Sequence, residues 1–246
     1  IFDMLLEAVE ADADEFGSTI KSCAVTQSES KRLRQRIRLH LAELYGAAEA
    51  DKLTERLLVE VGLKGYKLAL PTVENKWDER NSVLITYGDS ILSDNDPPLQ
   101  ALQRFLTKRA SNTFSGVHIL PFFPFSSDDG FSISDYTAVN PELGSWEDIE
   151  KIGLEFNLMS DLVLNHCSSE HSWFENYLRG ESPGAGYFIE PKPTDELSKV
   201  VRPRSSPLLT KFETANGQRS VWCTFGPDQI DLDFSNPEVL FEIIKI

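Results

Sequence analysis

Cysteine is scarce in this sequence of 246 residues, and no apolar run approaches the length of a membrane span. The three cysteines, Cys23, Cys167 and Cys223, are odd in number and far apart, which fits neither a disulfide framework nor a zinc site. We therefore expect a protein of the reducing cytoplasm. Cys167 directly follows His166, which suggests a thiol nucleophile. Neighbouring residues of a strand point to opposite faces, so we do not favour that interpretation.

Positive charge is also in short supply. The chain has 24 Lys and Arg against 39 Asp and Glu, a formal net charge of −15. This balance argues against nucleic acid and against anionic membranes as partners. An anionic ligand would need its own local group of Arg or Lys. A basic run around Arg32–Arg38 lies in a helical pattern, and we interpret it as a solvated helix face.

The first part of the chain, residues 1–80, is predicted to be a helical extension followed by a linker. Apolar residues at helical spacing predict one helix over 31–45 and a second over 47–61, with Gly62 at its end. The residues expected to face inward are Leu33, Ile37, Leu41 and Leu44 in the first helix and Leu53, Leu57, Leu58 and Val61 in the second.

The pattern changes at Asn81, where short β-branched and apolar runs begin to alternate with helical segments. Strands are predicted at 82–87, 117–120 and 161–165, with helices at 99–110 and 145–156. Three strands separated by helices in this way are typical of β–α–β units in a parallel sheet. Residues 81–166 are therefore predicted to form an α/β sheet, although the chain is too short for eight such units.

The third predicted strand is the run Asp161–Leu164, which ends in Asn165 and His166. Its apolar character predicts a strand buried on both faces. Because active sites of parallel sheets lie where strands end, Asn165 and His166 are candidate site residues. The alternative is a buried strand that merely ends in a polar pair.

Residues 167–220 are rich in Pro, Gly and Ser and are too long for an ordinary connection. We expect them to form a subdomain inserted after the third strand. Residues 221–246 are predicted to return to the sheet. Asn236, Pro237 and Glu238 form a helix start, and no stop signal follows, so we expect this helix to continue beyond Ile246.

Polar clusters follow all three predicted strands: Tyr87/Asp89, then Asp128–Phe131 with Asp135-Tyr136, then Asn165-His166. Further motifs are Gly116–Phe125, Leu143–Trp146, Arg202-Pro203-Arg204 and Phe225–Asp231. In the order and spacing of these motifs, residues 76–246 resemble glycoside hydrolase family 13, the α-amylase family, in its sucrose phosphorylase-like branch. The extension ending in Trp77-Asp78-Glu79 is more similar to glucosylglycerate and related sugar phosphorylases.

The resemblance implies a fold, an activity and partners. The fold would be the first three units of a (β/α)8 barrel, with the inserted subdomain after the third strand. The activity would be a retaining double displacement on an α-glucoside, in which phosphate accepts the glucosyl group to give α-glucose 1-phosphate. The partners would be a small sugar and phosphate as co-substrate, without a cofactor, and a homodimer of the full-length protein is possible.

The resemblance also assigns candidate substrate-binding residues. Asp128 and His166 would bind sugar hydroxyls, Phe131 and Phe225 would offer apolar faces to the ring, and Arg204 would reach phosphate or the acceptor; Asp89 and Gln229 complete the set. The plainer alternatives are a simple turn at Asp129-Gly130, core packing of the two phenylalanines, and a solvated loop around Arg202 and Arg204. Asn165 lies where amylases often ligate calcium, but the phosphorylase branch generally does without it, so we predict no metal.

The chain departs from the family in one important respect. The nucleophilic Asp, the acid Glu and a later His-Asp pair of the family have no counterpart in residues 1–246 and would lie beyond Ile246. We therefore expect no catalytic residue in this part of the protein. Two other functions stay open: a hydrolase or transglycosylase of the same family, which differs in what attacks the intermediate, and a non-catalytic sugar-binding module.

Overall fold

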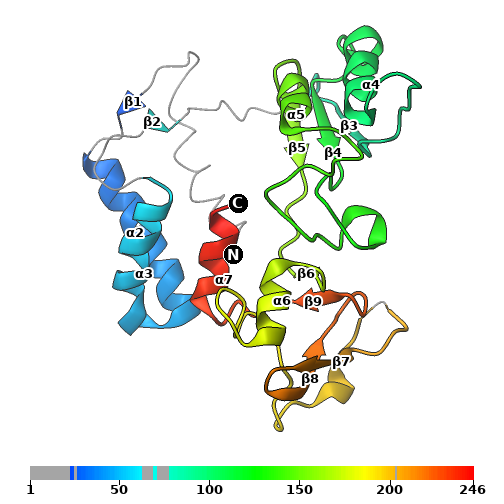
Figure 1. Cartoon of the computed structure of the whole chain (residues 1–246). Helices are drawn as coiled ribbons and strands as arrows, with labels where there is room; N and C mark the ends of the chain where they lie inside the picture. The colour runs from blue at the N-terminus through cyan, green and yellow to red at the C-terminus, as the bar shows by residue number, and fades with distance from the viewer. Residues whose placement is uncertain (1–22, 25–26, 63–68, 71–77, 203) are drawn as a thin grey trace. The chain divides into compact units, whose positions relative to one another are not determined.

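The computed structural model of the protein describes residues 23–24, 27–62, 69–70, 78–202 and 204–246. Trp77 and Pro203, which belong to motifs quoted above, lie outside these ranges. The chain forms two compact units (Figure 1). One combines Ile1–Trp77 with Pro237–Ile246, and the other is Asp78–Asn236.

The first unit is helical. It contains α2 (Gln27–Tyr45), α3 (Ala47–Glu60), α7 (Pro237–Ile244) and a short antiparallel pair of β1 (Cys23–Ala24) and β2 (Ala69–Leu70). Ile37 and Leu41 of α2 and Leu53 and Leu57 of α3 are buried, which confirms the centre of both predicted stripes. Leu44, at the end of α2, is 38% exposed, so the stripe does not extend to the last turn.

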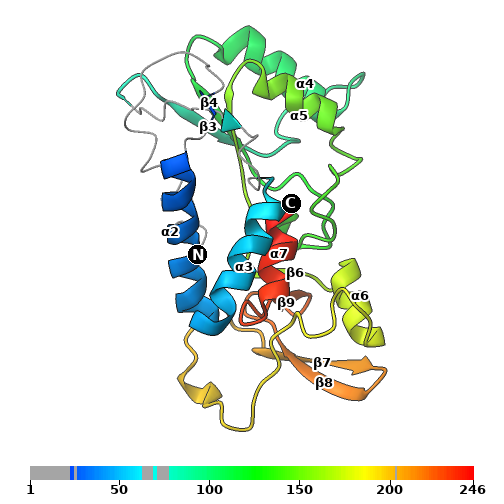
Figure 2. The ribbon, with the colours of Figure 1, turned by 90° about the vertical axis from the view of Figure 1, so that its left-hand side faces the viewer.

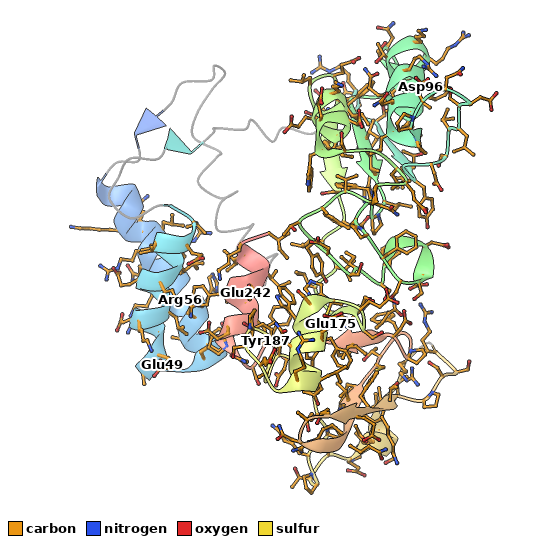
Figure 3. All side chains as sticks on the ribbon, in the orientation of Figure 1. Glu49, Arg56, Asp96, Glu175, Tyr187 and Glu242 are labelled. Carbon is orange, nitrogen blue, oxygen red and sulfur yellow. The ribbon has the colours of Figure 1, made fainter. Side chains whose placement is uncertain are left out.

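Arg56 connects α3 to α7 within this unit (Figure 3). Its Nη2 donates to Oε2 of Glu238 at 2.8 Å, and its Cζ lies 3.9 Å from the ring centroid of Phe241. Glu238 is in the first turn of α7, where a carboxylate also interacts favourably with the helix dipole. The pair of contacts therefore fastens the C-terminal helix to the preceding helical hairpin.

The second unit contains a parallel sheet. Its elements are β3 (Val83–Thr86), α4 (Pro98–Phe105) continued by the π-helix η2 (Leu106–Ala110), β4 (Gly116–Ile119), α5 (Trp146–Gly153) and β5 (Asn157–Ser160). The strands lie in the order β3-β4-β5, and α4 and α5 pack side by side (Figure 2). Ser145 begins α5 in a capping box with Asp148, as predicted from the sequence. These β–α–β connections confirm the α/β class.

The third strand, however, was predicted in the wrong place. The strand is Asn157–Ser160, paired in parallel with β4, and residues 161–164 form no strand. The carbonyl of Val163 accepts a hydrogen bond from the Tyr136 hydroxyl at 2.9 Å instead of one from a neighbouring strand. All four residues of β5 are exposed, so the expectation of a strand buried on both faces was also wrong. Two of the four residues Asn157–Ser160 are polar, so the sequence lacks the apolar run by which a buried strand is recognised.

After Asn165 the chain forms antiparallel pairs. The elements are β6 (His166–Ser168), α6 (Ser172–Arg179), the short helix η4 (Leu197–Lys199), the hairpin of β7 (Leu209–Thr214) and β8 (Gly217–Trp222), and β9 (Gln229–Asp231), which pairs with β6. The rings of Phe188 and Phe212 pack edge-on against Phe174, with centroids 5.0 and 4.7 Å away. These aromatic contacts form the local core.

His171 precedes α6 and acts as its N-cap. Its Nδ1 accepts the backbone N–H of Trp173 at 3.0 Å. Burial lowers the pKa of His171 to about 4, so the imidazole is neutral at neutral pH and can accept this bond. Among the helices that the structure describes, none is long and apolar enough to cross a membrane.

Candidate substrate-binding site

Four of the candidate residues come together where the loop after β4 meets the β6–β9 pair. Nε2 of Gln229 donates to Oδ2 of Asp128 at 2.9 Å and lies 3.1 Å from Nε2 of His166. The same His166 nitrogen lies 3.0 Å from the carbonyl oxygen of Phe131. In the antiparallel register Ser168 is opposite Gln229 and His166 is opposite Asp231. His166 and Gln229 therefore lie at neighbouring positions on one face of the pair.

The surroundings of His166 determine its protonation. Burial lowers the pKa of His166, and the bond to the Phe131 carbonyl with the nearby carboxylates of Asp231, Asp128 and Asp228 offsets only part of that effect. A neutral ring that donates Nε2–H to Phe131 leaves Nδ1 as an acceptor towards the Asn165 amide, 3.5 Å away. His166 can thus offer Nδ1 as an acceptor without adding charge, which suits a neutral sugar.

Asp128 lies in a tight turn with an unusual backbone. The turn is a short 3-10 segment, Asp128–Gly130, in which Asp128 has φ 57°, Asp129 φ 50° and Gly130 φ 105°. Left-handed conformations at residues other than Gly cost roughly 1–3 kcal/mol and persist only where neighbours hold them. At Gly130 a Cβ atom would lie 2.7 Å from the carbonyl oxygen of Pro121, so no larger residue fits. The Asp-Asp-Gly sequence is therefore more than an ordinary surface turn.

The aromatic candidates differ in what they contact. Phe225 packs on His166 with ring centroids 5.1 Å apart. The guanidinium of Arg204 lies 5.6 Å from the centroid of the same Phe225 ring, within cation–π range. Phe131 contributes its backbone carbonyl to His166, and its side chain is half-buried. The structure thus brings Arg204 and Phe225 to the cluster, and it connects Phe131 through the backbone.

The loop that carries Arg204 is tied to the segment before Phe225. Nη1 of Arg202 donates to the carbonyl of Thr224 at 2.9 Å. Thr224 in turn donates its backbone N–H to Oδ1 of Asp231 at 3.0 Å and its hydroxyl to Oδ2 of the same buried carboxylate. Arg202 is therefore an anchor for the loop, whereas Arg204 is exposed.

One candidate does not join the cluster. Asp89 lies in the exposed turn that follows β3, and among the described residues no hydrogen bond or ion pair connects it to Asp128, His166 or Gln229. The carboxyl end of β3 is the expected side of the sheet for a site, but the contacts of the cluster come from later segments.

The sequence did not identify Asp228 as a site residue. Its carboxylate accepts hydroxyl hydrogen bonds from Ser126, Ser127 and Ser132, all of which belong to the loop that carries Asp128. Asp228 directly precedes Gln229. Serines are common in loops, and more than ninety residues separate Asp228 from these three. No pattern in the sequence therefore indicates that the serines and Asp228 are in contact.

Among the described residues, no group of three or more His, Cys, Asp or Glu side chains is placed to hold a metal ion. The absence of a metal from the complete protein stays a prediction. Asn165, the position considered for calcium, directs its amide nitrogen towards Nδ1 of His166 at 3.5 Å.

Comparison with known proteins gives the family context. The model of the α-amylase catalytic domain matches residues 112–246. The chain is 46% identical over 213 residues to a glucosylglycerate phosphorylase of Allomeiothermus silvanus, covering 87% of this chain and 38% of that protein. It is 39% identical over 215 residues to a glucosylglycerate phosphorylase of Escherichia coli, with the same shares of 87% and 38%. The chain thus spans less than two fifths of the length of these relatives.

A solved structure shares the fold. The crystal structure of a sucrose 6F-phosphate phosphorylase from Thermoanaerobacter thermosaccharolyticum has a TM-score of 0.61 and 31% identity, over 70% of this chain and 37% of that one. With the family match, β3, β4 and β5 are the first strands of a (β/α)8 barrel, as the sequence motifs implied.

Proposed function

Because the chain belongs to the α-amylase family, we propose that the complete protein is a glucosyl-transferring phosphorylase acting on an α-glucoside. Its reaction would be a retaining double displacement. A carboxylate outside this chain attacks the anomeric carbon while an acid protonates the departing oxygen, and phosphate then takes the glucosyl group to release α-glucose 1-phosphate. Relatives named glucosylglycerate phosphorylase and sucrose phosphorylase support this choice. The relatives named glucosylglycerate phosphorylase favour glucosylglycerate as the α-glucoside, and sucrose is the alternative.

The observation that carries the proposal is the hydrogen bond from Gln229 to Asp128, with His166 3.1 Å from the same Gln229 nitrogen and packed on the ring of Phe225. Asp128 would accept a hydrogen bond from one hydroxyl of the glucosyl unit, and Nδ1 of neutral His166 would accept one from another. Gln229 carries a second amide proton beyond the one given to Asp128. A neutral polyol bound by short polar groups and an aromatic face is the interaction that this arrangement supports.

Arg204 supports phosphate rather than water as the second substrate. Phosphate must approach a protein of formal net charge −15, so a local cation has to offset the repulsion. Arg204 lies over the Phe225 ring at the edge of the cluster, and a guanidinium binds phosphate oxygens in pairs. A hydrolase would have no need of this cation.

We expect the Arg204→Ala variant of the complete enzyme to lose phosphorolysis selectively. A charge-assisted bond to phosphate contributes roughly 1.5–3 kcal/mol. Its loss should cut transfer to phosphate about ten- to a hundred-fold, while transfer to water is largely spared. The measurement is the ratio of glucose 1-phosphate to free glucose at saturating donor and limiting phosphate.

Lys199→Ala is the matched control, because Lys199 is an exposed cation of the same segment that pairs with Glu196 at 2.6 Å. Its product ratio should equal that of wild type. An unchanged ratio in Arg204→Ala would assign Arg204 to the protein surface and favour the hydrolase.

Residues 1–246 alone should show no glucosyl transfer. Ile85 is 63% and Met159 44% exposed, and both lie in one register row of the three-stranded sheet. Apolar sheet faces of this kind promote self-association. Size-exclusion chromatography should show oligomers, and a coupled assay should detect no glucose 1-phosphate. Robust product formation by this chain would place the catalytic groups within it.

A further inference from the structure

Asp228 lies at the centre of a group of hydroxyl side chains. A single oxygen, Oδ2, lies 2.9 Å from Oγ of Ser126, 2.5 Å from Oγ of Ser127 and 3.1 Å from Oγ of Ser132. We call these three residues the serine cage. Ser126 and Ser127 precede the Asp128–Gly130 turn and Ser132 follows it, so the carboxylate is hydrogen-bonded to both sides of the turn.

The protons of this group can be assigned without conflict. An ionised carboxylate only accepts, and each serine has one hydroxyl proton. Ser126 and Ser127 therefore donate to Asp228, and the Ser168 hydroxyl, 2.7 Å from Ser126, donates to Ser126 Oγ. The Ser132 hydroxyl has two acceptors within reach, Oδ2 of Asp228 at 3.1 Å and Oγ of Ser126 at 2.9 Å. Ser168 Oγ also accepts the backbone N–H of Glu170 at 3.0 Å. Every hydroxyl then has an acceptor, which fits an ionised carboxylate at the centre of the group.

The charge is stable at neutral pH. Burial raises the pKa of Asp228, but the hydrogen bonds from Ser127, Ser126 and Ser132 together outweigh it, and the net pKa lies below the ordinary value. The cage is thus held by charge-assisted bonds, which are about twice as strong as neutral ones.

The turn inside the cage needs such support. Asp128 and Asp129 are both left-handed, a conformation that the surrounding structure has to impose. The backbone contributes a closing bond from Ser126 N to Ser132 O at 2.9 Å and a longer one from Ser132 N to Ser127 O at 3.3 Å. The side chain of Asp228 adds the link from the turn to the β9 segment.

That link has a direct geometric consequence. Asp228 and Gln229 are consecutive, and Gln229 donates to Asp128. The segment Asp228-Gln229 therefore holds the turn through the Asp228 carboxylate and donates to the Asp128 side chain of that turn through Gln229. The backbone N–H of Ser169 also donates to the Asp228 carbonyl at 2.7 Å, which connects Asp228 to the end of β6, the strand that begins with His166.

We propose that Asp228 is a positioning residue for the reaction proposed above, and that its carboxylate, through the serine cage, holds Asp128 in place against Gln229 and His166 before the sugar binds. Asp228 does not touch the substrate. It acts through Asp128, and the proposal rests on the proposed function only in its kinetic readout.

The test uses Asp228→Ala and Asp228→Asn in the complete enzyme. We expect Asp228→Ala to lower kcat/KM for the glucosyl donor by about ten- to a hundred-fold, and Asp228→Asn by less, because the amide oxygen still accepts hydroxyl protons. Asp129→Asn, which alters an exposed carboxylate of the same turn, should stay within about two-fold of wild type.

A double-mutant cycle separates positioning from general stability. If Asp228 acts through Asp128, adding Asp228→Ala to Asp128→Ala should cause little further loss of kcat/KM. If Asp228→Ala lowers kcat/KM by the same factor in the Asp128→Ala background as in the wild-type background, Asp228 is merely structural and the proposal is overturned. Thermal unfolding of each variant identifies any that fails to fold. In that case Ser127→Ala, which removes one hydrogen bond of the serine cage, takes the place of the Asp228 variant.

A crystal structure of Asp228→Asn or Ser127→Ala provides a readout without catalysis. We expect the Asp128 turn to leave its left-handed conformation or the bond from Gln229 to Asp128 to break. An unchanged turn and bond in both variants would overturn the positioning role. A wild-type enzyme that transfers no glucosyl group from any α-glucoside would instead overturn the proposed function, and the structural readout would still decide the role of Asp228.

Discussion

Replacing Asp128 by alanine in the complete enzyme should lower kcat/KM by between about thirty-fold and ten-thousand-fold. The change removes the acceptor of a sugar hydroxyl and also the acceptor of the buried Gln229 amide, 2.9 Å away. Each group left without a partner costs about 1–3 kcal/mol, and 1.4 kcal/mol corresponds to a factor of ten. Steady-state kinetics with an α-glucoside donor and phosphate measures the effect.

His166→Ala should give a loss of similar size, since it removes the Nδ1 acceptor and the surface on which Phe225 packs. Asp129→Ala is the control, because Asp129 is the exposed neighbour of Asp128 and makes the same turn. It should retain most of the activity. Near-wild-type kinetics for both Asp128→Ala and His166→Ala would show that these residues do not bind the sugar.

Gly130→Ala should have the largest effect on stability. Gly130 has φ 105°, and a Cβ atom there would lie 2.7 Å from Pro121 O and 3.2 Å from Pro121 Cβ. The backbone cost is about 1–2 kcal/mol, and overpacking adds about 1–3 kcal/mol. We expect the free energy of unfolding to fall by roughly 2–5 kcal/mol, measured by denaturant titration, and kcat/KM to fall with it because the adjacent Asp128 moves.

Gly217→Ala isolates the backbone contribution. Gly217, the first residue of β8, has φ 92°, and its added Cβ would meet no atom within 4 Å. Its cost should therefore be limited to the backbone part, about 1–2 kcal/mol. Equal losses in the two variants would mean that Pro121 moves aside and that close packing does not define the Asp128 turn.

The sequence predicted the parts of the structure that depend on local chemistry. The capping box at Ser145 and the strands beginning at Val83 and Gly116 follow from short-range patterns, and the structure confirms them. The gathering of Asp128, His166, Gln229 and Phe225 could be expected from the family motifs, and the structure brings them together. Their roles towards a substrate stay predictions.

The failures have physical causes. The apolar run at 161–164 looked like a strand, but the carbonyl of Val163 is bonded to the Tyr136 hydroxyl, a contact no local pattern reveals. The strand itself, Asn157–Ser160, has half its residues polar and is specified by pairing with β4. Asp228 depends on three serines about a hundred residues earlier, so only the folded chain shows its partners.

The pairing of β6 with β9 has a consequence for the evolution of this protein. Ser168 is opposite Gln229 and His166 is opposite Asp231, and alternate residues of a strand face opposite sides. A shift of β9 by one residue against β6 would exchange the two faces of β9 and turn Gln229 away from His166. Natural variation in β9 should therefore consist of substitutions, while changes of length collect in the mostly exposed stretch from Lys192 to Val201.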